Sequence, residues 1–214
     1  MSDPADGATS SSDRSLAASL RLIVGDAHVV DRPDDLDRAA RTTASEGRTP
    51  RIIVRPHDRD QVQAIMRLAA VHRIPVYPIS GGRNWGYGDA CPPTAGQILI
   101  DLSRMDRIVS VDATLAYAVI EPGVTQRQLH EHLVAHRLQL WMDCTGAGPD
   151  ASVLGNIMDR GFGHSRYGDR AAHVCAMEFV LADGEVLETG SPSSNVSARG
   201  RHVFAHGLGP DIAG

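Results

Sequence analysis

Two glycine-rich loops hold the residues of this chain whose types and spacing could do chemistry. The first, Ser80 to Gly88, has four glycines in nine residues and directly follows an apolar run. Glycine lets successive backbone N–H groups face one anion, because it accepts positive φ and close approach. Arg83 adds a permanent charge that can bond a phosphate through two nitrogens, and Ser80 and Asn84 add neutral hydrogen bonds. An ordinary tight turn is the alternative that this composition leaves open.

The second loop, Cys144 to Ala151, leads to Ser152, which can cap a short helix reaching Arg160. A helix N-terminus attracts anions through its unpaired N–H groups and its dipole. Two such loops indicate a diphosphate held from two sides, so a dinucleotide is the simplest ligand. The chain has no Gly-x-Gly-x-x-Gly opening a helix after the first strand and no Gly-Lys-Ser/Thr loop. These absences argue against a doubly wound nicotinamide site and a phosphate loop of the nucleotide triphosphatases, and leave flavin.

Regular elements must position these loops, and the hydrophobic pattern predicts them. The segment from Asp13 to Glu46 is helix-compatible, with apolar residues at helical spacing near its start. An Asp183-Gly184 turn between apolar runs predicts a hairpin. We expect strands over 51–55, 74–79, 98–102, 108–112 and 116–120, helices over 58–73, 125–136 and 152–160, and hairpin arms over 174–181 and 185–188. The resulting order predicts an α+β fold.

Composition excludes several classes of function. A formal net charge of -5 argues against nucleic acid as a partner, because phosphate attraction needs a basic face. No run approaches the roughly 18 apolar residues of a membrane span, and Met1 to Asp13 lacks a secretory signal, so we expect a cytoplasmic protein without a membrane partner. The three cysteines are widely spaced and read as free thiols, and the ten histidines are scattered, so no metal site is expected.

Five short motifs follow one another along the chain: Pro78-Ile-Ser-Gly-Gly-Arg-Asn-Trp-Gly-Tyr-Gly88, Ile120-Glu-Pro-Gly-Val124, Ser152-Val-Leu-Gly-Asn156, Gly161-x-Gly163-x-x-x-Tyr167-Gly168-Asp169 and Leu181-Ala-Asp-Gly184. In this order they resemble the FAD-binding domain of the vanillyl-alcohol oxidase and p-cresol methylhydroxylase family. The resemblance covers roughly residues 48 to 214. A PCMH-type (vanillyl-alcohol oxidase-like) FAD-binding domain, N-terminal portion, is therefore the expected α+β fold.

The resemblance also implies roles for individual residues. The first glycine loop and the Ser152 to Asn156 loop would clasp the FAD pyrophosphate, and the stretch from Asn156 to His164 would lie along the flavin. Tyr87 matches a tyrosine that contacts the substrate phenolate in phenol-oxidising members, with simple loop packing as the alternative. The implied cofactor-binding residues are Ser80, Gly81, Gly82, Arg83, Asn84, Ser152, Gly155, Asn156, Gly161 and His164.

Two departures from the family pattern bear on the chemistry. Relatives that bond FAD through a Gly-Gly-His histidine would place it at position 83, so Arg83 excludes covalent attachment at this loop. In the oxidase branch a catalytic aspartate precedes the second loop. Here the segment 141–151 is one residue longer, with Gly146 or Ala147 at the matching place and Asp150 nearby.

The resemblance implies a domain plan and a reaction. Residues 1–47 are expected to form a leader and arm, and residues 48–214 an incomplete FAD-binding domain without the substrate domain. The implied activity is hydride removal from the benzylic carbon of a para-substituted phenol, with a small phenolic substrate and either a homo-oligomer or a cytochrome electron acceptor as partners. The alternatives are an FAD-dependent 2-hydroxy-acid dehydrogenase and a truncated, non-catalytic FAD-binding fragment.

Overall fold

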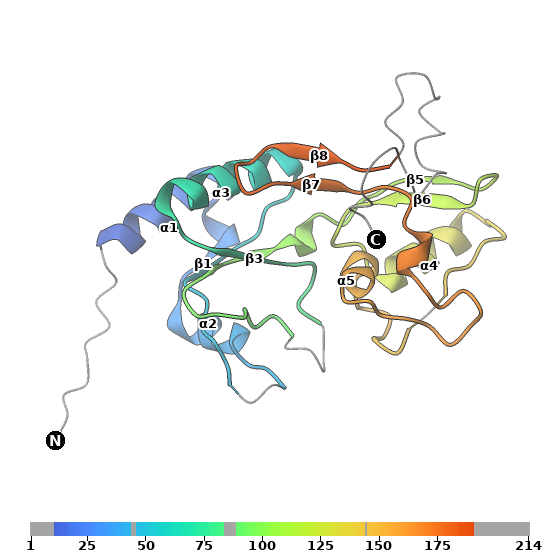
Figure 1. Cartoon of the computed structure of the whole chain (residues 1–214), viewed down its shortest axis with the longest axis horizontal. Helices are drawn as coiled ribbons and strands as arrows, with labels where there is room; N and C mark the ends of the chain where they lie inside the picture. Colours follow the sequence, from blue (N-terminus) through green and yellow to red (C-terminus); the bar gives the residue numbers. More distant parts are fainter. Residues whose placement is uncertain (1–10, 44–45, 84–88, 144, 191–214) are drawn as a thin grey trace.

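The computed structural model of the chain describes residues 11–43, 46–83, 89–143 and 145–190 (Figure 1). Its helices are α1 (Ser11–Val24), α2 (Pro33–Ala39), α3 (Arg59–His72), α4 (Gln126–Ala135) and α5 (Val153–Met158), with 3-10 turns η1 (Asp26–His28), η2 (Leu102–Arg104) and η3 (Ala171–His173). Its strands are β1 (Val29–Val30), β2 (Ile52–Val54), β3 (Val76–Ile79), β4 (Ile98–Asp101), β5 (Ile108–Asp112), β6 (Tyr117–Ile120), β7 (Glu178–Val180) and β8 (Val186–Glu188).

The main sheet has four strands in the order β1-β2-β4-β3. β4 lies between β2 and β3 and is parallel to both, whereas β1 pairs with β2 in the antiparallel direction. α3 connects β2 to β3, so this part of the chain is a β-α-β unit into which β4 inserts. β2, β3 and β4 are parallel, so their carboxyl ends lie at the same edge of the sheet. The first glycine loop follows β3 at this edge, where Ile79 pairs with Asp101 of β4.

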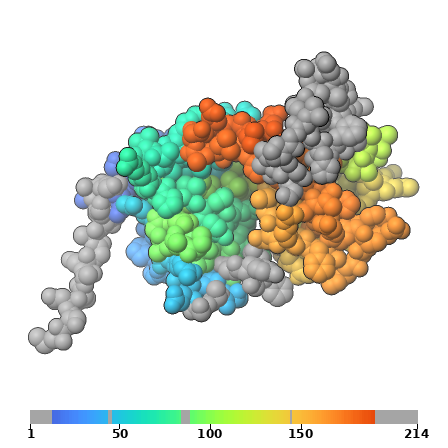
Figure 2. Space-filling view, viewed as in Figure 1, coloured from blue at the N-terminus to red at the C-terminus, as the bar shows by residue number. Residues whose placement is uncertain are grey.

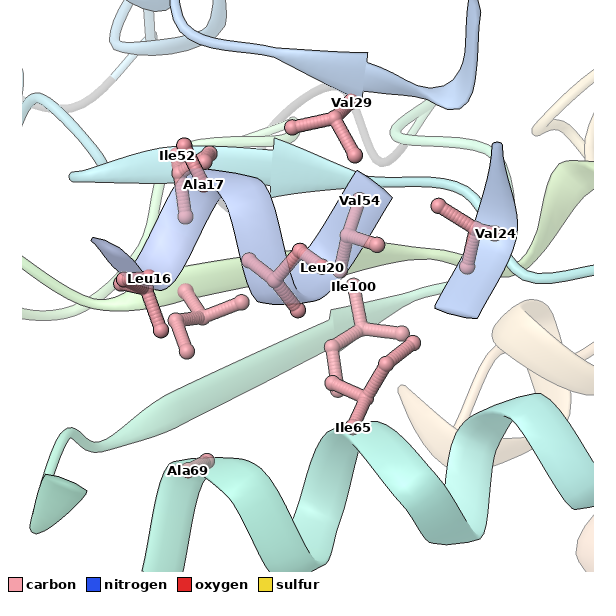
Figure 3. Close-up of a cluster of buried hydrophobic side chains, with 11 residues drawn as sticks. Leu16, Ala17, Leu20, Val24, Val29, Ile52, Val54, Ile65, Ala69 and Ile100 are labelled. Atoms are coloured by element: carbon pink, nitrogen blue, oxygen red, sulfur yellow. The ribbon is translucent and has the colours of Figure 1, made fainter. Parts of the chain in front are cut away.

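Helices α1 and α3 form the core with one face of this sheet (Figure 3). Leu16 and Leu20 of α1 and Ile65 of α3 are at most 1% exposed. They pack against Val54 and Ile100, which alternate along their strands with residues of the opposite face. Ile53 and Leu99 on that opposite face are also buried, which explains the continuous apolar runs of β2 and β4.

Local signals explain where α3 and α4 begin and end. Asp58 caps α3 by accepting a hydrogen bond from the Gln61 N–H, and Arg73 closes the helix in a left-handed conformation. Thr125 and Gln128 form a reciprocal capping box at the start of α4. These caps satisfy backbone donors that would otherwise lack partners at the first turn of each helix.

The β5–β6 hairpin, α4 and α5 lie beside the main sheet, and the β7–β8 hairpin lies along α3 (Figures 1 and 2). The turn of that last hairpin is fastened to the helix, because Gln63 and Arg67 both donate to the Gly184 carbonyl, at 2.7 Å and 3.1 Å. Arg59 adds an ion pair with Glu178 at 3.4 Å. These contacts therefore hold the β7–β8 hairpin against α3, the helix of the β-α-β unit.

The predicted α+β fold is confirmed, and most of the predicted elements are observed. The strand over 51–55, the helix over 58–73 and the Asp183-Gly184 hairpin are observed as β2, α3 and β7–β8. The first arm of that hairpin is shorter than the predicted range 174–181, because 171–173 form a 3-10 turn and strand pairing starts at Glu178. The segment 13–46, expected to be helix-compatible, holds most of α1 and all of α2, but it also contains the strand β1, which was not predicted and which pairs with β2.

Among the described residues, Cys91 and Cys175 are free thiols, and no cluster of three metal-ligating side chains is found. A search of the same residues for a helix of sufficient length and hydropathy to cross a membrane finds none. The division of the chain at residue 47 stays a prediction. The hydrophobic core nevertheless includes α1, which precedes that boundary.

Candidate functional site

The first glycine loop leaves the sheet at the end of β3. Ser80 and Gly82 are half-buried, while Gly81 and Arg83 are exposed. Gly82 has a φ of +64°, and a Cβ there would lie 2.9 Å from the Cβ of Ala90. Glycine is therefore needed at position 82 both for its positive φ and because Ala90 lies too close to leave room for a side chain.

The second loop ends at α5, whose first turn is capped by Ser152. The Ser152 Oγ accepts a hydrogen bond from the Gly155 N–H at 2.9 Å, and Ser152 is 8% exposed. A backbone hydrogen bond from Val153 to the Val124 carbonyl, at 2.9 Å, holds α5 beside the start of α4. The predicted cap at Ser152 is confirmed, and the helix it starts has six residues.

The first loop meets the first turn of α5 at Ser80 and Gly155, which are 75 positions apart in the sequence. A Cβ added at Gly155 would lie 3.2 Å from Ser80 Oγ and 2.6 Å from Ser152 Oγ. Both distances are shorter than ordinary van der Waals contact, so the missing side chain lets α5 approach the first loop. Ser80, Ser152 and Gly155, which the sequence placed in one site, are brought together.

Asn156 and Gly161 form a second close pair at the end of α5. The Gly161 N–H donates to the Asn156 carbonyl at 2.8 Å. A Cβ at Gly161 would overlap the Asn156 amide group. Because Gly161 has no side chain, the Asn156 amide group can occupy this space.

A buried arginine that the sequence analysis did not single out supports this region. Arg170 is 7% exposed, and its Nη1 donates to Asn156 Oδ1 at 3.0 Å. Its Nη2 donates to the Asp143 carbonyl and to Gln126 Oε1. Gln126 is 3% exposed and in turn donates to the Gly148 carbonyl at 3.0 Å. No local pattern reveals these roles, because the partners are 14 to 44 positions apart.

Asp150 of the second loop interacts with two arginines, Arg127 of α4 and Arg83 of the first loop. Arg127 donates to Asp150 at 3.0 Å, and this hydrogen bond, together with the positive charges of Arg127 and Arg83, lowers the pKa of Asp150 below its usual value. Arg83 therefore lies within electrostatic reach of the second loop. Asp150 is ion-paired, so it is charged at neutral pH.

Residues 161–170 fold back on themselves in a tight turn. Gly163 donates to the Gly168 carbonyl at 3.0 Å, and isolated bridges join Phe162 to Asp169 and Gly163 to Thr145. His164 is exposed and packs edge-on to Phe162, with ring centroids 6.2 Å apart. In the described part of the chain, His164 makes no hydrogen bond or ring contact with Ser80 or Gly155, so its role beside the flavin stays a prediction.

An exposed aromatic group borders this turn. Trp141 is 66% and Tyr167 48% exposed, and their rings meet edge to face with centroids 6.1 Å apart. Arg166 lies over the Tyr167 ring, at 5.4 Å from its centroid. Nearby, one oxygen of the Asp143 carboxylate, Oδ2, is buried without a hydrogen-bond partner among the described residues.

Two predicted site residues, Asn84 and Tyr87, lie outside the described residues. The site as described therefore consists of glycines and the hydroxyl-bearing Ser80 and Ser152 on two segments that approach each other, which we call the cradle. Arg83 is exposed on the first of these segments, and the Asn156 amide lies on α5. Close backbone approach, hydroxyls and one guanidinium suit a diphosphate, because each group can bond a phosphate oxygen without steric obstruction.

Comparison with known proteins gives the same ligand class. The sequence profile of a family described as FAD binding domain matches residues 50–190. The chain is 43% identical over 204 residues to a 1'-carboxy-chondrochloren decarboxylase of Chondromyces crocatus, covering 94% of this chain and 37% of the relative. It is 34% identical over 201 residues to the 4-cresol dehydrogenase [hydroxylating] flavoprotein subunit of Pseudomonas putida, covering 91% and 38%.

The fold comparison agrees with the sequence comparison. A crystal structure of p-cresol methylhydroxylase with substrate bound superposes with a TM-score of 0.87 at 32% identity, covering 96% of this chain and 40% of that one. More distant relatives include a D-lactate dehydrogenase [cytochrome] of Saccharomyces cerevisiae, 31% identical over 65% of this chain. The chain thus spans about two fifths of the length of the first relatives it matches.

Proposed function

Since this chain belongs to the family of FAD-binding domains, we propose that it is the cofactor-holding part of an oxidoreductase that oxidises para-substituted phenols at the benzylic carbon. The observation that carries the proposal is the close approach of the first glycine loop and the first turn of α5, at Ser80 and Gly155. Similarity to a 4-cresol dehydrogenase subunit supports the substrate class.

The described residues fit FAD. A side chain at Gly155 would fill the space between Ser80 and Ser152, so the cradle depends on glycine. We propose that the Ser80 and Ser152 hydroxyls and the backbone of Gly81, Gly82 and Gly155 hold the diphosphate, with Arg83 neutralising part of its charge. Asn156, Gly161 and His164 would line the isoalloxazine side, and Asn84 would complete the first loop.

When bound, FAD would supply the two-electron acceptor for a benzylic hydride. The task of the chain is to hold the phenol in contact with the ring and to stabilise its deprotonated oxygen, because a phenolate pushes electron density to the para position. We propose Tyr87 as the group that bonds the phenolate. Asp150 is not proposed as a base, because its ion pair with Arg127 favours the charged, weakly basic form.

FAD-dependent oxidation of a 2-hydroxy acid is the second candidate function, favoured by the 31% identity to a D-lactate dehydrogenase. We propose as protein partner either a cytochrome that accepts the electrons or a second copy of the same flavoprotein subunit. From the composition we also propose a cytoplasmic location. The two candidate substrates differ in the group that must be bound, a phenolate or a carboxylate. They can therefore be separated by direct reduction of bound flavin.

The first test is retention of FAD. The purified chain is incubated with FAD and desalted, and its absorbance spectrum is recorded beside an Arg83→Ala variant. We expect flavin bands in the native chain and weaker bands in the variant. A colourless native chain would contradict the proposal that these residues alone hold the cofactor.

The second test concerns the substrate. Anaerobic addition of 4-cresol to the FAD-loaded protein should bleach the flavin absorbance, whereas D-lactate should leave it unchanged. Bleaching by D-lactate alone would favour the second candidate function. Retained flavin that neither compound reduces would overturn the assignment of catalysis to this chain.

A further inference from the structure

The guanidinium of Arg170 fixes the orientation of the Asn156 amide group. Arg170 has only donor groups, so Asn156 must turn Oδ1 toward Nη1, at 3.0 Å. Nδ2 then points away from Arg170, and it is the atom of Asn156 nearest the Cβ position of Gly161. Among the described residues, Nδ2 has no hydrogen-bond partner, so a donor is left for another group.

The position of Arg170 is itself determined from two further directions. Its Nη2 is held by the Asp143 carbonyl and by Gln126, a residue that is 3% exposed. A buried guanidinium needs its donors satisfied, because unpaired buried charge is strongly unfavourable. The fork geometry allows Nη1 and Nη2 to serve partners on different segments at once, which a single ammonium cannot do.

We propose that Arg170 is a positioning residue for the cofactor: it holds Asn156 so that Nδ2 donates a hydrogen bond to an acceptor atom of bound FAD. The inference rests on the proposed function, because Asn156 is a proposed cofactor contact. It adds a residue 14 positions away, outside both glycine loops. Arg170 acts through Asn156 and does not itself touch the ligand.

A double-mutant cycle on FAD binding tests this coupling. Arg170→Lys keeps the charge but loses the fork, so it should weaken FAD binding roughly fivefold to tenfold, the loss expected for one hydrogen bond. In an Asn156→Ala background the same change should alter the dissociation constant by less than about twofold. An equal loss in both backgrounds would overturn the proposal and leave Arg170 a merely structural residue.

Arg166→Lys is the matched control, because Arg166 is an exposed arginine of the same turn. It should leave the dissociation constant of FAD unchanged. A fall in affinity equal to that of Arg170→Lys would also count against a specific role for Arg170. Thermal unfolding of each variant without FAD checks that all are folded at the temperature of the titration.

A measurement without cofactor separates this proposal from the proposed function. Three-bond couplings across χ1 of Asn156, measured by NMR on the ligand-free chain, should report one rotamer in the native protein and averaging in Arg170→Lys. Averaging already present in the native chain would overturn the positioning role. A native chain that shows one fixed rotamer but binds no FAD would instead overturn the proposed function.

Discussion

A methyl group at position 155 would lie 2.6 Å from Ser152 Oγ and 3.2 Å from Ser80 Oγ, so it would press on the cap of α5 and on the first loop. Gly155→Ala should push α5 away from the first loop and weaken FAD binding at least roughly tenfold, while lowering stability by about 1–3 kcal/mol. A helical glycine normally gains stability on substitution by alanine. A titration of FAD fluorescence and a thermal melt measure the two effects.

Gly146→Ala is the control for that substitution. A Cβ at Gly146 would meet nothing within 4 Å, and the residue belongs to the second loop, which leads into α5. Its melting temperature should equal that of the native chain. If Gly155→Ala binds FAD as tightly as the native chain, the two loops do not form the cradle.

His28 makes the stability of the chain dependent on pH. Burial, and then the positive charges of Arg104, Arg55 and His57, lower the pKa of His28 from its usual 6.5. The unfolded chain therefore binds a proton more readily, and stability should fall as the pH drops from about 6.5 through the lowered value. Melting temperatures at about pH 7.5 and pH 5.5 should differ more in the native chain than in His28→Gln. Parallel falls in both proteins would mean that other groups cause the acid sensitivity.

At the residue scale, the sequence pointed to Ser80 and Ser152 because hydroxyls beside glycine-rich loops carry a local signal, whereas Gly155 followed only from the family resemblance. Arg170 and Gln126 carry none, since their burial arises from partners 14 to 44 positions away. Local composition therefore predicts the groups that would face the ligand better than the groups that hold them.

At the element scale, α1 offers a matched pair of leucines. Leu20 is fully buried in the core, whereas Leu22 is 89% exposed on the same helix. Leu20→Ala should lower the free energy of unfolding by about 2–5 kcal/mol, because it leaves a cavity between α1 and the sheet. Leu22→Ala should change it by less than about 0.5 kcal/mol. Urea unfolding measures both, and equal effects would mean that α1 does not pack as described.

The hairpin turn on α3 gives a second test at this scale. Gly184 has a φ of +81°, and a Cβ there would lie 2.6 Å from Arg67 Cγ. Gly96 has nearly the same φ, +80°, with nothing within 4 Å. Gly184→Ala should lower the free energy of unfolding by about 2–3 kcal/mol. Gly96→Ala should lower it by about 1 kcal/mol, because at position 96 only the strain of the positive φ contributes. Equal losses by urea unfolding would show that contact with Arg67 adds nothing.

Element types could be predicted because their periodicity is strong, as in α3 and in the apolar runs of β2 and β4. Their pairing could not, since β4 inserts between β2 and β3 although it follows both in the chain. The start of β7 was also predicted too early. A short apolar run does not reveal whether a partner strand lies alongside it.

At the scale of the whole molecule, ligand binding and folding are linked. FAD that binds the folded chain alone should raise its free energy of unfolding by about 2.7 kcal/mol at a free concentration of about 100 times the dissociation constant. The melting temperature should rise by roughly 5–10 °C. Riboflavin, which lacks the diphosphate, is the control and should give a much smaller rise. An equal rise with riboflavin would contradict a site built around the diphosphate.

The main core cluster is complete within residues 16–102, before either α4 or α5 is reached in the chain. During synthesis the apolar residues of this cluster can therefore begin to pack once β4 has left the ribosome. The second loop and Arg170 emerge about 45 to 70 residues afterwards. Until then the nascent chain would hold only the first of the two loops, so we expect tight binding of the flavin only after residue 170 has been translated.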